Sequence, residues 1–364
     1  MIRDPYIDSV RAALWGRPVD PKTPVTDELI VMHMRQGTAA LVFPSLLARE
    51  DLSSYARAQM KGVCMHAYQQ HTRLQYTLSK AWTAFENAGI RAVLMKGAGL
   101  AALYPSPEQR EWGDIDLFVG KEQYHPACAV MRETFPTALK FDEELDHYKH
   151  YNLIADGISI EIHRVTVSLQ HPLDERRYEA MEREGMEQAV PMTSNGLEVR
   201  VPEPTFNALF VFLHAWEHMM TSGANLRQLC DHALLLHHYS SSINIPRLER
   251  YLRSLHLMDV WRLFMAIEVN YLELPSPEAP LLDTSINARA ERLLSDLLNG
   301  SLRTPEARPN TATNRFVRKW RTMRERVNNA RRMAPYSPAY TRHLIRTTWL
   351  HGLSRLFAKD RRWE

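Results

Sequence analysis

The stretch Val93–Val119, VLMKGAGLAALYPSPEQREWGDIDLFV, carries the pattern from which the fold of this 364-residue chain is predicted. It predicts a short apolar strand that ends at Lys96-Gly97, and a second strand that contains Asp114 and Asp116. Successive side chains of a strand point to opposite faces. The two aspartates therefore share one face of the second strand, and its apolar side chains take the other.

Two carboxylates on one strand face repel each other, and a divalent cation commonly compensates that repulsion. Hard oxygen ligands suit Mg²⁺ or Mn²⁺, which often bridge to substrate phosphates. Surface strands also alternate in charge, so incidental acids on an edge strand are the alternative. The apolar neighbours of Asp114 and Asp116 predict a buried strand, however, where unpaired carboxylates are costly. This favours a metal site for phosphoryl transfer.

A third acid comes from the segment Ile158–His163, which alternates between isoleucines and the polar Ser159, Glu161 and His163. We predict that Asp114, Asp116 and Glu161 bind metal and form the catalytic centre. Two metal ions held by such carboxylates activate an attacking oxygen and stabilise the pyrophosphate that leaves an in-line displacement.

Lys96 and Gly97 lie where a strand gives way to a helix. Glycine lets backbone N–H groups approach a phosphate, the helix N-terminus favours an anion, and lysine adds a charge. A Lys-Gly pair is also common in purely structural turns. Arg110 is a further candidate for holding a phosphate, and a simple ion pair with an acid is its alternative.

The helical second half offers the remaining candidates. His214 and His218 share a helix face, and with Glu217 they match the zinc pattern H-x-x-E-H, which is a weak signal without a third ligand. For His218, contact with a substrate and ordinary helix packing are both open. Arg227 and Asp231 are four residues apart, so either they form a surface ion pair or Asp231 orients Arg227 toward a nucleotide.

The predicted fold class is α+β, with a small mixed-sheet core between an N-terminal helical segment and a helical C-terminal half. The expected division is an N-terminal helical region at 1–88, an α/β core at 89–202, a helical domain at 203–300 and a basic helical region at 301–364. Strands are expected at 91–95, 114–119, 158–163 and 197–201. Helices are expected after a cap at Thr26-Asp27, and at 52–88, 98–103, 121–134, 205–220, 226–239 and twice within 245–272.

Composition and charge narrow the class of protein. Three separated cysteines without CxxC spacing, no signal-peptide pattern and no apolar run near the ~20 residues of a membrane span predict a cytoplasmic protein. Residues 301–364 contain 16 Lys and Arg against 4 Asp and Glu. This basic region either packs on the body of the protein or meets an anionic partner, such as nucleic acid or a membrane surface.

These motifs resemble the nucleotidyltransferase superfamily with the polymerase-β-like fold, and within it the uncharacterised bacterial nucleotidyltransferases. The resemblance covers about residues 25–290. It rests on these residues: Lys96-Gly97-Ala98-Gly99-Leu100, Tyr104-Pro105, Arg110, Asp114-Ile115-Asp116-Leu117, Glu161-Ile162-His163, His218, Arg227 and Asp231. The usual Gly-Ser turn of the superfamily is replaced here by Lys96-Gly97.

The resemblance implies that Asp114, Asp116 and Glu161 bind Mg²⁺ or Mn²⁺, and that Lys96 and Arg110 hold phosphates. The helical half with His218 and Arg227 would close over the nucleotide or acceptor. The expected activity moves a nucleoside monophosphate from a nucleoside triphosphate such as ATP to an acceptor, which is a sugar, a peptide or protein, or an RNA. The alternatives are a non-catalytic nucleotide-binding protein on the same fold and a toxin-like transferase that modifies RNA or protein.

Overall fold

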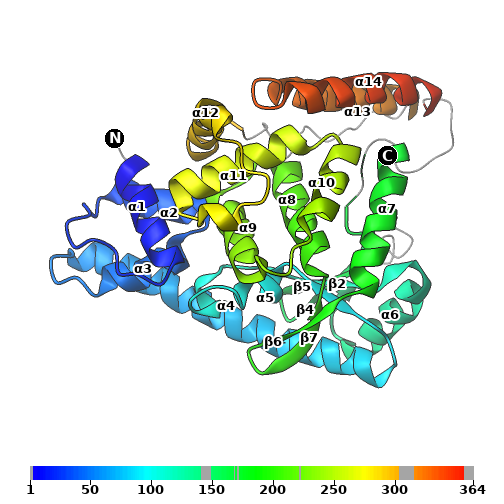
Figure 1. Cartoon of the computed structure of the whole chain (residues 1–364). Coiled ribbons are helices and arrows are strands. Elements are labelled where there is room, and N and C mark those ends of the chain that lie inside the picture. Colours follow the sequence, from blue (N-terminus) through cyan, green and yellow to red (C-terminus); the bar gives the residue numbers. More distant parts are fainter. Residues whose placement is uncertain are drawn as a thin grey trace.

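A computed structural model describes residues 3–140, 149–167, 169, 172–220, 223–302 and 315–355. A five-stranded sheet lies between a long helix below it and a group of helices above it, as Figure 1 shows. The predicted α+β class, with a mixed sheet between helical segments, is confirmed.

The N-terminal segment is helical, as predicted. Its helices are α1 (Arg3–Leu14), α2 (Asp27–Gln36), α3 (Ala39–Leu47) and α4 (Ser54–Asn87). The predicted cap is present, since the Thr26 hydroxyl accepts a hydrogen bond from the backbone N–H of Leu29 at 3.2 Å. Helix α4 begins two residues later than expected and runs beneath the sheet (Figure 1).

The sheet has the strand order β1-β2-β5-β4-β3. Its strands are β1 (Val93–Met95), β2 (Asp114–Phe118), β3 (Leu139–Lys140), β4 (His150–Ala155) and β5 (Ile158–His163), with α5 (Gly97–Ala101) and α6 (Gly120–Thr134) between them. Strands β2 and β5 are parallel, and the other neighbours are antiparallel. The sequence predicted β1, β2 and β5 but not β3 or β4.

The sheet has one apolar and one polar face. Ile115, Leu117, Leu153, Ile160 and Ile162 have no exposed surface, and they share a cluster of buried residues with side chains of α4 and α6. The acids and histidines alternate with these residues and so take the other face. A shift of one residue in pairing would exchange the two faces, so burial of the apolar set fixes the register.

A hairpin and a helix connect the sheet to the helical half. Helix α7 (Pro172–Glu187), which the sequence did not predict, is followed by β6 (Val190–Ser194) and β7 (Leu197–Val201). A turn at Asn195-Gly196 joins these two strands, and both turn residues have positive φ, 51° and 81°.

The helical half contains every helix that the sequence predicted there. Its helices are α8 (Pro204–Met220), α9 (Leu226–Tyr239), α10 (Ile245–Ser254), α11 (Met258–Leu272) and α12 (Asn287–Leu298). They share one buried cluster with the N-terminal helices. The division at 88, 202 and 300 stays a prediction.

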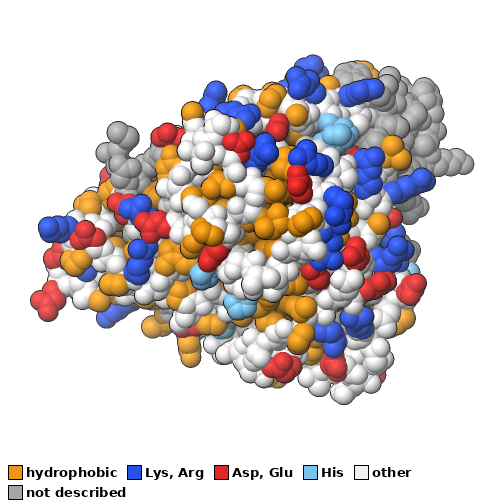
Figure 2. Space-filling model, viewed as in Figure 1, with side chains coloured by type: hydrophobic (Ala, Val, Ile, Leu, Met, Phe, Trp, Pro, Cys, Tyr) orange, Lys and Arg blue, Asp and Glu red, His pale blue; other side chains and the backbone are white. Residues whose placement is uncertain are grey.

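The basic C-terminal region folds onto this body as α13 (Arg315–Arg332) and α14 (Pro338–Arg355), which lie side by side in Figure 1. Tyr340 packs on Trp216 of α8, with ring centroids 5.9 Å apart. Lys and Arg side chains gather along this rim of the molecule (Figure 2). The parts of the predicted region at 303–314 and 356–364 lie outside the described residues. Among those described, no helix combines the length and apolar character needed to cross a membrane.

Two helical glycines form a matched test of packing. A Cβ added at Gly185 of α7 would overlap the Phe206 ring, whereas one added at Gly62 of α4 would meet nothing within 4 Å. We expect Gly185→Ala to lower the free energy of unfolding by about 1–3 kcal/mol through overpacking. Gly62→Ala should raise it by about 0.5–1 kcal/mol, because alanine restricts the unfolded chain more. Denaturant titration of both variants measures this, and equal effects at the two positions would contradict the packing around Gly185.

Candidate active site

A cavity of about 270 Å³ lies between the polar face of the sheet and the helices α8 and α9. Eight of the nine site residues predicted from the sequence line it: Lys96, Gly97, Arg110, Asp114, Asp116, His218, Arg227 and Asp231. The ninth, Glu161, lies one strand farther into the sheet, directly opposite Asp116 in the parallel pairing of β2 and β5. The fold therefore brings together side chains separated by up to 135 positions.

Asp116 is the most deeply buried charge of this site, with no exposed surface. Its Oδ1 accepts hydrogen bonds from Lys96 Nζ and His163 Nε2, each at 3.0 Å. Burial opposes ionisation, but Lys96 and His163 outweigh it and hold the pKa of Asp116 below its usual range. Its second oxygen, Oδ2, is buried and has no hydrogen-bond partner among the described residues. This oxygen is therefore a candidate ligand for a bound cation.

The pKa of Asp114 is shifted in the opposite direction from that of Asp116. The neighbouring Asp116 carboxylate, together with burial, raises the pKa of Asp114. The raised pKa of Asp114 is the effect expected of two carboxylates that share one strand face. A cation between them would remove their repulsion.

The Lys96-Gly97 turn holds the lysine in an unusual backbone conformation. Lys96 has φ 47° and ψ −134°, and Gly97 has φ 36°. Such a conformation costs a non-glycine residue about 1–3 kcal/mol. A Cβ at Gly97 would lie 3.1 Å from the Trp112 ring and 3.3 Å from the Asp114 carbonyl oxygen, so the turn needs glycine there. The strain is offset by the contact of Lys96 with Asp116, and both aspartates raise the pKa of Lys96 against the effect of burial.

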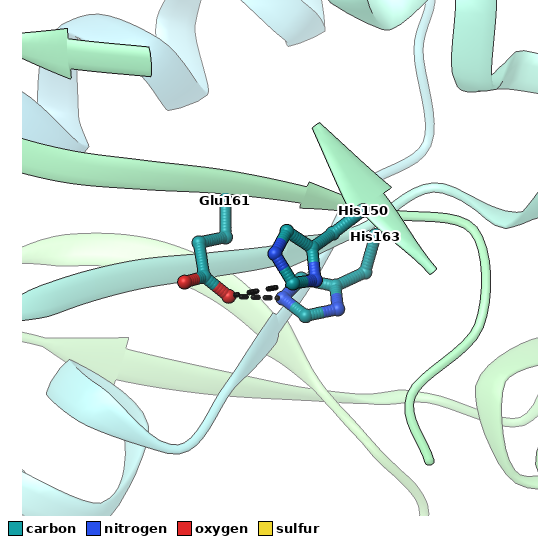
Figure 3. Close-up of side chains that lie close together, drawn as sticks. All are labelled: His150, Glu161 and His163. Atoms are coloured by element: carbon teal, nitrogen blue, oxygen red, sulfur yellow. Dashed lines mark hydrogen bonds and ion pairs between the residues drawn. The ribbon is translucent and has the colours of Figure 1, made fainter. Parts of the chain in front are cut away.

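Glu161 lies beside two histidines, as Figure 3 shows. Its Oε2 accepts a hydrogen bond from His163 Nε2 at 3.1 Å and is 4.0 Å from His150 Nδ1. Burial disfavours the charge of Glu161, but the hydrogen bond from His163 lowers its pKa. His163 therefore joins the two acids of β2 and β5.

Arg110 forms the tightest ion pair around the cavity. Its Nε and Nη2 donate to the two oxygens of Asp231 at 2.7 and 2.8 Å, and Nη1 donates to the Gly97 carbonyl at 3.3 Å. Tyr104 also donates to Asp231, at 2.8 Å. Of the two possibilities for Arg110, the structure shows the ion pair, which connects the loop before β2 to helix α9.

Arg227 is held by a different partner. Asp231 is buried and pairs with Arg110, and no hydrogen bond or ion pair joins it to Arg227 among the described residues. Neither the expected surface ion pair nor the expected orientation of Arg227 by Asp231 is therefore seen in this structure. Arg227 Nη1 instead donates to the backbone carbonyl of Glu111 at 2.5 Å, and its Nε is buried without a hydrogen-bond partner among the described residues. Arg227 reaches the cavity from the first turn of α9.

His214 and His218 face the cavity from α8, with their ring centroids 4.5 Å apart. Burial, and then the nearby Lys96, lower the pKa of both rings, so they are neutral beside the acids. Within the described residues, the group of three close metal-ligating side chains is His150, Glu161 and His163, and not the H-x-x-E-H run.

Sequence analysis missed His150 and several cavity-lining residues. His150 belongs to β4, whose alternation of His150 and Asn152 with Tyr151 and Leu153 was the available signal. Trp112, Asn225 and Gln228 also line the cavity, and nothing in their local sequence marks them.

Comparisons with known proteins agree with this arrangement at the level of the family. A family model described as uncharacterised nucleotidyltransferase matches residues 25–271 and so spans every predicted site residue. No curated protein matches the chain. A solved structure of an antigenic nucleotidyltransferase-like protein from Paracoccidioides brasiliensis is 13% identical, with a TM-score of 0.33, and the match covers 57% of this chain and 94% of that one.

The ion pair of Arg110 and Asp231 gives a stability prediction. Asp231→Asn leaves a buried guanidinium without its counter-charge, because Arg110 and Asp231 are only 7% and 3% exposed. We expect a loss of about 3–5 kcal/mol in the free energy of unfolding. The double variant Arg110→Met/Asp231→Asn should recover most of that loss, since it also removes the stranded charge. Equal destabilisation by the single and the double variant would contradict this account.

Proposed function

Since this chain belongs to the family of uncharacterised nucleotidyltransferases, we propose that it transfers a nucleoside monophosphate from a nucleoside triphosphate to an acceptor and releases pyrophosphate. The observation that carries the proposal is the pair Asp114 and Asp116, which share one strand face and open into the cavity with Lys96. We also propose that the sheet and its acids have the polymerase-β-like arrangement of the nucleotidyltransferase superfamily. The acceptor is a hydroxyl or phosphate of a sugar, of a protein side chain or of an RNA end.

The donor set fits a hard divalent cation. Asp114 and Asp116 offer carboxylate oxygens, the ligands that Mg²⁺ and Mn²⁺ prefer. The buried Oδ2 of Asp116 lacks a partner among the described residues, and the Asp116 carboxylate raises the pKa of Asp114 although Lys96 lies nearby. Glu161 is the proposed third acid, because its Cα is paired with that of Asp116 across β2 and β5. When bound, the ion neutralises charge on the phosphates.

The side chains around the aspartates fit the remaining needs of this reaction. Lys96 is buried and charged next to Asp116, so it supplies a fixed positive charge for a phosphate. Arg227 reaches the cavity with an unused Nε–H, which can donate to a phosphate oxygen. Arg110 is committed to Asp231 and is proposed to position the loop before β2, with its charge contributing from a distance.

The charge of the two histidines and the volume of the cavity limit how a nucleotide can bind. His214 and His218 place neutral rings at the cavity and so add no charge beside Lys96. Ligand pockets usually measure about 300–1,000 Å³. A cavity of about 270 Å³ is slightly smaller than that range, so it holds part of a nucleoside triphosphate unless α8 and α9 move apart.

Loss of the aspartates should abolish turnover. We expect wild-type protein with Mg²⁺ or Mn²⁺ and nucleoside triphosphate labelled at the α-phosphate to move label onto an acceptor and release pyrophosphate. Asp116→Asn and Asp114→Asn should each reduce the rate by at least about 100-fold, the scale seen when one transition-state charge contact is removed. A lysate fraction supplies candidate acceptors, and mass spectrometry identifies the labelled one.

Turnover that survives both substitutions would overturn the proposed site. Nucleotide binding without turnover across sugar, protein and RNA acceptors would instead indicate a nucleotide-binding protein on the same fold.

Arg227 gives a more selective prediction. Arg227→Ala should raise the KM for the nucleoside triphosphate roughly 10- to 100-fold, because a hydrogen bond to a charged group contributes about 1.5–3 kcal/mol. Arg253→Ala is the matched control, since Arg253 pairs with Glu249 on the exposed side of α10. Initial-rate kinetics of both variants measure the difference. An unchanged KM in Arg227→Ala would exclude Arg227 from phosphate binding.

A further inference from the structure

A group of three metal-ligating side chains lies next to the aspartates but outside the cavity that they line. His150, Glu161 and His163 each offer one ligand atom, and these atoms all lie within 4.8 Å of one another (Figure 3). His150 and His163 are directly opposite each other across the antiparallel pair β4 and β5, and Glu161 is two residues before His163. Strand alternation therefore places all three on the same face.

The ring of His163 is oriented as it is in many metal sites. Its Nδ1 lies 3.3 Å from the Val165 carbonyl oxygen, and because a carbonyl only accepts, Nδ1 carries the hydrogen and donates. A histidine that binds a metal commonly donates its other N–H to a backbone carbonyl in this way. Nε2 is then the nitrogen directed at Glu161 Oε2, 3.1 Å away.

From this arrangement, we propose that His150, Glu161 and His163 bind a second divalent cation of the borderline class, such as Mn²⁺, Co²⁺ or Zn²⁺, and discriminate against Mg²⁺. Two imidazole nitrogens and one carboxylate are a donor set that these ions accept. Mg²⁺ prefers oxygen ligands. The aspartates on β2 offer only oxygen, so the two neighbouring positions would select different ions.

The burial of the three side chains suits a site that exchanges its ion with solvent. The side chain of His163 is 3% exposed, whereas those of His150 and Glu161 are 24% and 22% exposed. One ligand is therefore fixed in the sheet, and the other two border solvent. An ion can reach them without unfolding of the sheet.

The second site is coupled to the first through one nitrogen, and this coupling rests on the proposed function. His163 Nε2 also donates to Asp116 Oδ1 at 3.0 Å. The same nitrogen cannot coordinate a cation and donate that hydrogen bond. Filling the histidine site would therefore release Asp116 Oδ1 toward the catalytic ion, while Lys96 remains its other partner.

Direct metal binding tests the proposal without reference to activity. Full-length protein is freed of metal with a chelator and titrated with Co²⁺, and visible absorption reports nitrogen coordination. We expect the wild type to bind one Co²⁺ with visible bands that excess Mg²⁺ does not remove. His150→Ala and Glu161→Gln should each weaken this binding at least 10-fold. His163 is buried, so His150→Ala is the primary variant, and circular dichroism confirms that it folds.

Two further variants separate this site from the catalytic one and from adventitious binding. His66→Ala removes an exposed histidine of α4 and should leave the Co²⁺ signal unchanged. Asp114→Asn should also keep the signal, even if the proposed transferase activity fails. Absence of the bands in the wild type, their persistence in His150→Ala or their loss with excess Mg²⁺ would each overturn the proposal.

Discussion

The structure around the site depends on one buried carboxylate. Asp116 has no exposed surface, yet it is held in its charged form by Lys96 and His163. A buried charge is tolerated only with close partners, because leaving water costs several kcal/mol. Those partners explain otherwise unfavourable local features, namely the positive φ of Lys96 and the fixed ring of His163. The local backbone is thus shaped by the electrostatics of a single side chain.

The same principle operates a second time between the sheet and the helices. Arg110 and Asp231 form a bidentate pair that is nearly free of solvent, with Tyr104 as a third member. The planar guanidinium fixes both distance and angle, so it determines how α9 sits over β2. The cavity between them has its shape because this pair holds its two walls together.

Features that depend on local alternation of residues could be predicted from the sequence. Features that depend on contacts between distant residues could not. The alternating strands β2 and β5 were found, and with them the common face of Asp114, Asp116 and Glu161. Strand β4 was missed, although it alternates equally well, because its polar residues resemble a loop when no neighbour is known. The partner of Asp231 could not be predicted from the sequence either. Helical spacing suggested Arg227, whereas the tertiary fold supplied Arg110 from 121 positions away.

The pair of Arg110 and Asp231 also has a consequence for how the chain folds during synthesis. Residues of the sheet leave the ribosome before Asp231 does, since the chain is made from its N-terminus. Until α9 arrives, Arg110 has no counter-charge from Asp231, so the sheet cannot bury it at full stability. We therefore expect the loop before β2, which carries Arg110, to be fixed in place only when α9 docks.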